Sequence, residues 1–173
     1  MAAAFAQLAA LIMLFKILYV QCSKISTLLA AVPKWLWMLS FIALAIKILL
    51  QLGSTIPSLN TIAYGFRPIV IGYLHLIFLG VLTIFLTGFF LVTEKIVISK
   101  WLTRGIIIFV AGIIINELLL MLQGVTSLLN VSLDYINECL LATAIIMFAG
   151  LLVINRNLLN AKSLDDKSSS QAD

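Results

Sequence analysis

The sequence has few charged residues for its length. Of 173 residues, 11 are Lys or Arg and 7 are Asp or Glu, so charged residues make up 10% of the chain. A soluble domain is about 25% charged. Apolar residues make up 63% of this chain instead. The composition therefore excludes a soluble enzyme, a nucleic-acid-binding module and a disordered chain, and it predicts an integral membrane protein.

Residue types that build common catalytic and metal sites are also scarce. The chain has two cysteines and one histidine, too few for a four-ligand zinc site. It contains no P-loop, no dinucleotide-binding glycine fingerprint and no HExxH motif. The sequence shows no internal repeat, and five spans do not divide into the inverted halves found in many transporters. We therefore expect no self-contained catalytic site and no metal site.

Long apolar runs are what the sequence has instead. A helix needs about 20 mostly apolar residues to cross a bilayer, and continuous runs without alternation favour helices over a barrel. The sequence predicts an all-α integral membrane protein, a bundle of five transmembrane helices. The spans are expected at residues 2–20, 33–52, 68–92, 101–122 and 136–154, within one domain over 1–160. The polar, serine-rich residues 161–173 are expected to form a disordered cytoplasmic tail.

Basic residues between the spans predict the direction of the bundle, because Lys and Arg are enriched in cytoplasmic loops. Eight of the eleven basic residues fall near the loops after spans one and three or in the tail, and only Arg67 falls in the opposite loops. The N-terminus is therefore expected outside and the C-terminus inside. The uncharged first 14 residues do not resemble a signal peptide. An outward N-terminus would suit either a short tail or the later part of a longer protein.

Ionisable residues inside a span are costly and therefore mark candidate sites. Lys47, His75 and Glu117 lie in spans two, three and four, while Arg67 and Glu138 lie at the outer starts of spans three and five. The predicted directions place all five in the outer half of the bundle. Opposite charges at a similar depth are expected to pair, which reduces the cost of burying them. The sequence thus predicts one intramembrane polar cluster of Lys47, Arg67, His75, Glu117 and Glu138.

Small and polar residues also follow helical lines. His75 shares a stripe of span three with Gly72 and Gly80, and small residues allow helices to pack closely. His75 is either a haem or metal ligand, a proton-relay group, or a histidine hydrogen-bonded to a neighbouring helix. A second line runs along span four, and the short Glu117 side chain, about 100° from it, cannot reach far toward the interface. That line consists of Gly105, Gly112, Asn116 and Gln123.

One segment resembles a known group of proteins. Arg67-Pro68 is followed by Tyr73-Leu74-His75-Leu76 and Gly80. Residues 34–92 resemble the later half of bacterial multi-pass membrane proteins that are distantly similar to the haem–copper oxidase large subunit and to nitric-oxide-response haem membrane proteins. The resemblance implies a bacterial inner (plasma) membrane protein in which His75 is a possible haem ligand. The oxidase subunit uses several histidines on several spans, so this chain departs from it by having one.

Three functions follow as hypotheses. The first is a membrane subunit or fragment of a redox-related protein with His75 near a haem, whose second ligand would come from a Met, another subunit or a missing N-terminal half. The second is a proton- or ion-coupled small-solute transporter using Lys47, His75 and Glu117. The third is a non-catalytic structural subunit in which polar groups lock helices together. The expected partners are the lipid bilayer and either other membrane subunits or further copies of the chain, but no nucleic acid.

Overall fold

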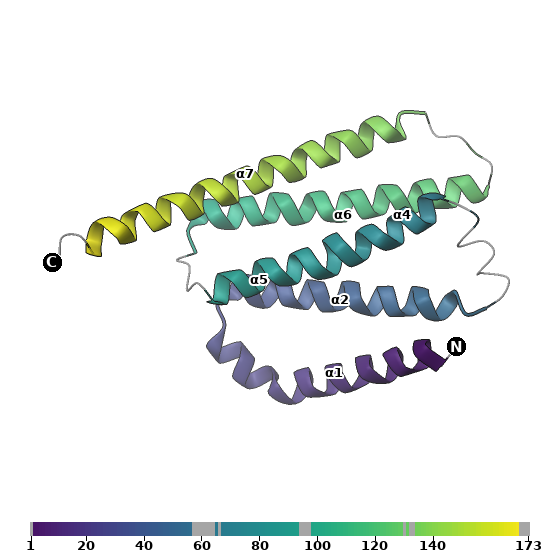
Figure 1. Cartoon of the computed structure of the whole chain (residues 1–173), viewed down its shortest axis with the longest axis horizontal. Helices are drawn as coiled ribbons and strands as arrows, with labels where there is room; N and C mark the ends of the chain where they lie inside the picture. The colour runs from purple at the N-terminus through teal and green to yellow at the C-terminus, as the bar shows by residue number, and fades with distance from the viewer. Residues whose placement is uncertain are drawn as a thin grey trace.

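The computed structural model is helical and describes residues 2–56, 65, 67–93, 98–129, 131 and 134–169 (Figure 1). Among these residues it contains no strand. A π-helical segment, η1, joins α4 to α5. The elements are α1 (Ala2–Leu28), α2 (Ala31–Gly53), α4 (Arg67–His75), η1 (Leu76–Thr83), α5 (Ile84–Thr93), α6 (Lys100–Leu128) and α7 (Ile136–Ser169).

Within this part of the chain, five helical stretches are long and apolar enough to cross a membrane. They are Ala3–Gln21, Ala31–Gly53, Arg67–Thr93, Lys100–Leu128 and Ile136–Leu159. Each overlaps one predicted span, so the prediction of five long apolar helices is confirmed. Pro33 and Pro68 lie in the first turns of α2 and α4, where the N–H that proline lacks has no partner within the helix. Ser99 caps α6, because its Oγ accepts a hydrogen bond from the amide of Leu102 at 3.1 Å.

The helices lie side by side in chain order, and consecutive spans run in opposite directions (Figure 1). α1 packs on α2, α2 on η1 and α5, α4 on α6, and α6 on α7. The two chain termini therefore lie at opposite ends of the bundle. We call the end that holds the start of α1 the N-terminal end, and the end that holds the start of α2 and α6 the C-terminal end.

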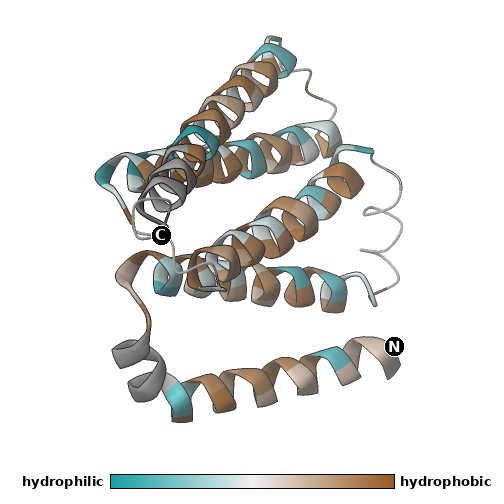
Figure 2. Cartoon of the chain, turned by 60° about the vertical axis from the view of Figure 1, so that its left-hand side comes forward, coloured by the Kyte–Doolittle hydropathy of each residue, from teal (hydrophilic) through white to brown (hydrophobic). Residues whose placement is uncertain are grey.

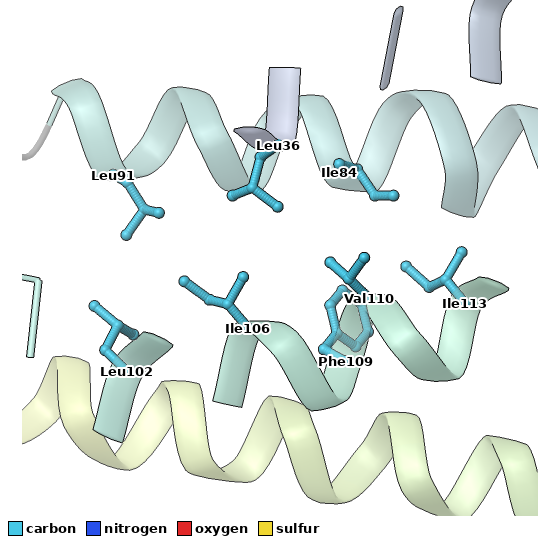
Figure 3. Close-up of a cluster of buried hydrophobic side chains, with 8 residues drawn as sticks. All are labelled: Leu36, Ile84, Leu91, Leu102, Ile106, Phe109, Val110 and Ile113. Carbon is cyan, nitrogen blue, oxygen red and sulfur yellow. The ribbon is translucent and has the colours of Figure 1, made fainter. Parts of the chain in front are cut away.

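The best-buried side chains lie where α2, α5 and α6 meet. Figure 3 shows the side chains of α2 and α5 facing those of α6. Hydrophobic residues, drawn in brown, predominate along the helices (Figure 2). Many of their large apolar side chains are exposed, as expected for a protein surrounded by lipid. The core cluster consists of Leu36, Ile84, Leu91, Leu102, Ile106, Phe109, Val110 and Ile113.

α7 extends well beyond the fifth predicted span, because its backbone stays helical to Ser169. This differs from the expectation of a disordered tail over 161–173, of which residues 170–173 lie outside the described residues. The expectation rested on polar composition. Polar composition indicates that a segment has no core to bury, but no Gly or Pro interrupts residues 151–169, so no residue there breaks the helix.

Candidate functional site

The contact between α4 and α6 sets the relative heights of two candidate residues. A Cβ built on Gly72 would lie 3.5 Å from the Cβ of Leu120, so these residues face each other across two antiparallel helices. One helical turn is 3.6 residues. Continuing this register by one turn toward the C-terminal end places His75 and Glu117 at the same height on neighbouring helices.

The contact between α2 and η1 adds a third residue at this height. A Cβ on Gly80 would lie 3.4 Å from the Cβ of Ala43. One turn from that pair toward the N-terminal end, Lys47 stands level with the end of α4, where His75 lies. The helix registers therefore place Lys47, His75 and Glu117 at a common height in the bundle, while their depth in a membrane stays a prediction.

Common height does not bring the five predicted residues into one cluster. Across the described ranges, no ion pair joins any two of them. Arg67 is the first residue of α4 and Glu138 the third of α7, and both are exposed near the N-terminal end. The expected mutual pairing is therefore absent from this part of the chain. Depth follows from counting residues along a span, whereas pairing also requires that the side chains face the same interface.

Lys47 is coordinated by amide side chains of α1 and α2. Its Nζ donates to Oε1 of Gln51 at 2.7 Å and to Oε1 of Gln7 at 3.3 Å. The amide oxygens replace part of the hydration of the ammonium group, and the bond to Gln7 ties α1 to α2. Sequence reasoning missed Gln7. The one signal for it was an amide residue inside an otherwise apolar run.

His75 makes its hydrogen bond within its own helix. Its Nδ1 lies 2.9 Å from the carbonyl oxygen of Ile71, so the neutral tautomer that donates from Nδ1 leaves Nε2 as an acceptor. Metal-ligating histidines are commonly oriented in this way. Within the described residues, however, no group of three or more His, Cys, Asp or Glu residues could hold a metal ion. Of the alternatives considered for His75, a hydrogen bond to a neighbouring helix is not observed.

Glu117 lies on the face of α6 that packs against α4. It shares this face with Leu120 and with Gly124, where a Cβ would lie 3.1 Å from Cγ1 of Ile69. The Oε1 atom of Glu117 is buried and has no hydrogen-bond partner among the described residues. A buried polar atom without a partner is costly. Glu117 therefore differs from Lys47, whose Nζ donates to two amide oxygens, and from His75, whose Nδ1 bonds to a backbone carbonyl oxygen.

The predicted line along span four is a packing face toward α7. A Cβ on Gly112 would lie 2.5 Å from Cγ of Met147, and the same register, continued by one turn, places Asn116 opposite Thr143. Both of these residues are buried. Thr143 donates to the carbonyl oxygen of Cys139 in its own helix at 2.8 Å. Nδ2 of Asn116 is buried and has no hydrogen-bond partner among the residues that the structure describes.

The π-helical segment is held by hydroxyl groups. Ser40 of α2 is buried, and its Oγ donates to the carbonyl oxygen of Val81 at 2.9 Å. Thr83 donates to the carbonyl oxygen of Phe78, five residues earlier, at 2.7 Å. π-Helical turns occur frequently at functional sites. Sequence reasoning did not predict this segment, because nothing in an apolar run distinguishes a π turn from an α turn.

The polar groups of the spans thus occupy four separate interfaces at neighbouring heights. They can join helices, and two of them, Nε2 of His75 and the carboxyl group of Glu117, can also take part in proton or ligand binding.

Tyr64 and Phe66, beside the residues that carry the resemblance to haem–copper-related proteins, lie outside the described residues. No family model matches the chain, and comparison with curated proteins and with solved structures found no similar protein.

Proposed function

We propose that the chain is a non-catalytic subunit of a membrane complex. The observation that supports this function best is the use of its intramembrane polar groups to join helices. Ser40 bonds α2 to η1, and Lys47 bonds α2 to α1. In the described residues these groups do not converge on a common site. Hydrogen bonds between helices and close packing are the forces that hold helices together in a bilayer.

The proposed partners are other membrane subunits or further copies of this chain, in the inner membrane of a bacterium. Mild-detergent extraction followed by native electrophoresis and mass spectrometry tests this function. We expect the chain to migrate in a stable complex well above its own mass of 19.0 kDa. A chain that is monomeric at every detergent and lipid concentration would overturn the proposal.

The relation to redox proteins is a further part of the proposal and is supported by His75. Its Nδ1–H donates to the backbone, which leaves Nε2 as the atom that can ligate a haem iron. The absorption spectrum of the purified complex tests this part alone. We expect a Soret band that shifts or disappears in His75→Ala, with Lys16→Ala as a control that leaves it unchanged. A complex without a Soret band would dismiss the redox relation and leave the subunit function standing.

A second candidate function is proton- or ion-coupled transport of a small solute. The observation in its favour is the buried carboxylate oxygen of Glu117 at the height of His75. Lys47 takes less part in this version than the sequence indicated, because amide groups of Gln7 and Gln51 already bind it. Flux in proteoliposomes would be lost in Glu117→Gln and kept in Glu138→Gln. Equal flux in both variants would exclude this function.

A further inference from the structure

Glu117 is an isolated acidic residue in an apolar face of α6. The residues of this face on either side of it, Ile113 and Leu120, are both buried, with 1% and 5% of their surface exposed. One carboxylate oxygen of Glu117 is buried with no hydrogen-bond partner in the described part of the chain. On an ionised carboxylate this oxygen would have lost its hydration without a replacement, and a charge inside a membrane is costly.

A buried carboxylate is usually stabilised by a nearby cation, but the neighbouring basic residues do not pair with Glu117. Lys47 donates to the amide oxygens of Gln51 in its own helix and of Gln7 in α1, and within the described residues it makes no ion pair with Glu117. Arg67 is exposed at the start of α4, about two turns from the height of Glu117. Protonation also lowers the cost of burying Glu117, because it removes the charge and gives the carboxyl group an O–H donor.

We infer that Glu117 is a proton-binding site inside the bundle, at the contact of α6 with α4 and η1. In the binding step the carboxylate takes a proton from a hydronium ion and releases water, and no other bond changes. This inference does not depend on the proposed function, since either a subunit or a carrier can contain such a site. It assigns a proton as a ligand of Glu117, and helix packing alone does not require this ligand.

The titratable groups around this site are few. η1 and α5 contain none. α4 contributes Arg67, Tyr73 and His75, of which His75 stands at the height of Glu117. α7 packs on another face of α6 and carries Glu138 and Cys139 near its start. The pH response of Glu117 is therefore expected to depend on His75 more than on any other group.

A hydrophobic carbodiimide tests the inference, because it crosses into the bilayer and adds to protonated carboxyl groups. The full chain in lipid vesicles is treated with dicyclohexylcarbodiimide over a range of pH, and the modified residue is located by peptide mass spectrometry. We expect modification at Glu117 that is lost as the pH rises, and that is absent in Glu117→Gln. The exposed Glu138 is the matched control, and Glu138→Gln should leave the labelling of Glu117 unchanged.

Mapping on the unaltered protein keeps the test valid if Glu117→Gln fails to fold. A second measurement is the infrared carbonyl band of a protonated carboxyl group, followed over the same pH range. Its loss on alkalinisation would support the site, as would a shifted pH midpoint of labelling in His75→Phe. Absence of labelling at Glu117, labelling that does not change with pH, or equal labelling of Glu138 would overturn the inference. This experiment measures neither solute flux nor complex assembly. A negative result would therefore overturn the proton-binding site without deciding between the proposed functions.

Discussion

Gly150 of α7 lies directly against the backbone of Phe109 in α6. A Cβ built on Gly150 would lie 2.8 Å from the amide nitrogen and 2.9 Å from the Cα of Phe109. Gly105 and Gly112 of α6 also lie close to α7, where a Cβ would be 3.2 Å from the amide nitrogen of Ile154 and 3.4 Å from that of Met147. Lipid chains are as apolar as leucine side chains, so two helices gain stability in a bilayer mainly by such close packing.

Gly150→Ala is expected to weaken the contact between α6 and α7. The added methyl group needs space that backbone atoms occupy, and overpacking of this kind costs about 1–3 kcal/mol. Unfolding in mixed micelles, followed by circular dichroism, measures the change in free energy. Gly53→Ala is the control, because a Cβ there meets no described atom within 4 Å. Equal stability of the two variants would contradict the close contact.

Ser40→Ala is expected to destabilise the packing of α2 on η1. It removes the hydrogen bond from Ser40 to Val81, and hydrogen bonds between membrane helices contribute about 0.6 kcal/mol on average and about 1.7 at most. The matched control is Thr87→Val, which removes a hydroxyl group that bonds only within its own span. The same micelle unfolding measures both variants. A loss in Thr87→Val as large as in Ser40→Ala would argue against a role for the bond between helices.

Asn116→Leu is expected to leave the fold as stable as before or to stabilise it. In the described part of the chain the buried amide nitrogen of Asn116 has no hydrogen-bond partner, and replacing such a group with an apolar one of similar size removes a desolvation cost. Thermal unfolding in detergent measures the sign of the change. A clear loss of stability would mean that Asn116 makes a polar contact across α6 and α7, for instance with Thr143.

The direction of the chain can be read from its cysteines. Cys139 is exposed near the start of α7, at the N-terminal end of the bundle. With the predicted outward N-terminus, a membrane-impermeant maleimide should label Cys139 in intact cells expressing Cys22→Ser. A cysteine at the opposite end, Ser99→Cys with both native cysteines replaced by Ser, should react only after permeabilisation. The reverse pattern would show that the bundle is inserted the other way.

Much of the fold could be predicted from the sequence, because each apolar run of about 20 residues is long enough for one membrane-spanning helix. The sequence also indicated that Gly105 and Gly112 lie along one line of span four. In the structure both residues contact α7. The grouping of Lys47 with Glu117 was not predictable to the same degree. Counting residues gave their common height, but Lys47 bonds to α1 while Glu117 faces α4. Which way a side chain faces depends on neighbours that a single span does not specify.

The π-helical segment marks another limit of the sequence. η1 accepts a hydrogen bond from Ser40 of α2, which lies 41 residues from its partner Val81 in the chain. A local pattern in span three carries no information about such a contact. Its effect is nevertheless considerable, because the change from α to π winding rotates the residues that follow. The face assigned to Gly80 from a uniform 100° per residue is therefore displaced relative to His75.

The arrangement of the helices in chain order bears on how the protein is made. Each span packs chiefly on the span before it and the span after it. A nascent chain can therefore dock each helix as it leaves the insertion machinery, without waiting for a distant partner, as expected for a fold rich in near-neighbour contacts. α7 emerges after α6 and closes the glycine-lined face of α6. Until then that face is open, which makes the interval before α7 inserts the step at which a chaperone or a competing helix would act.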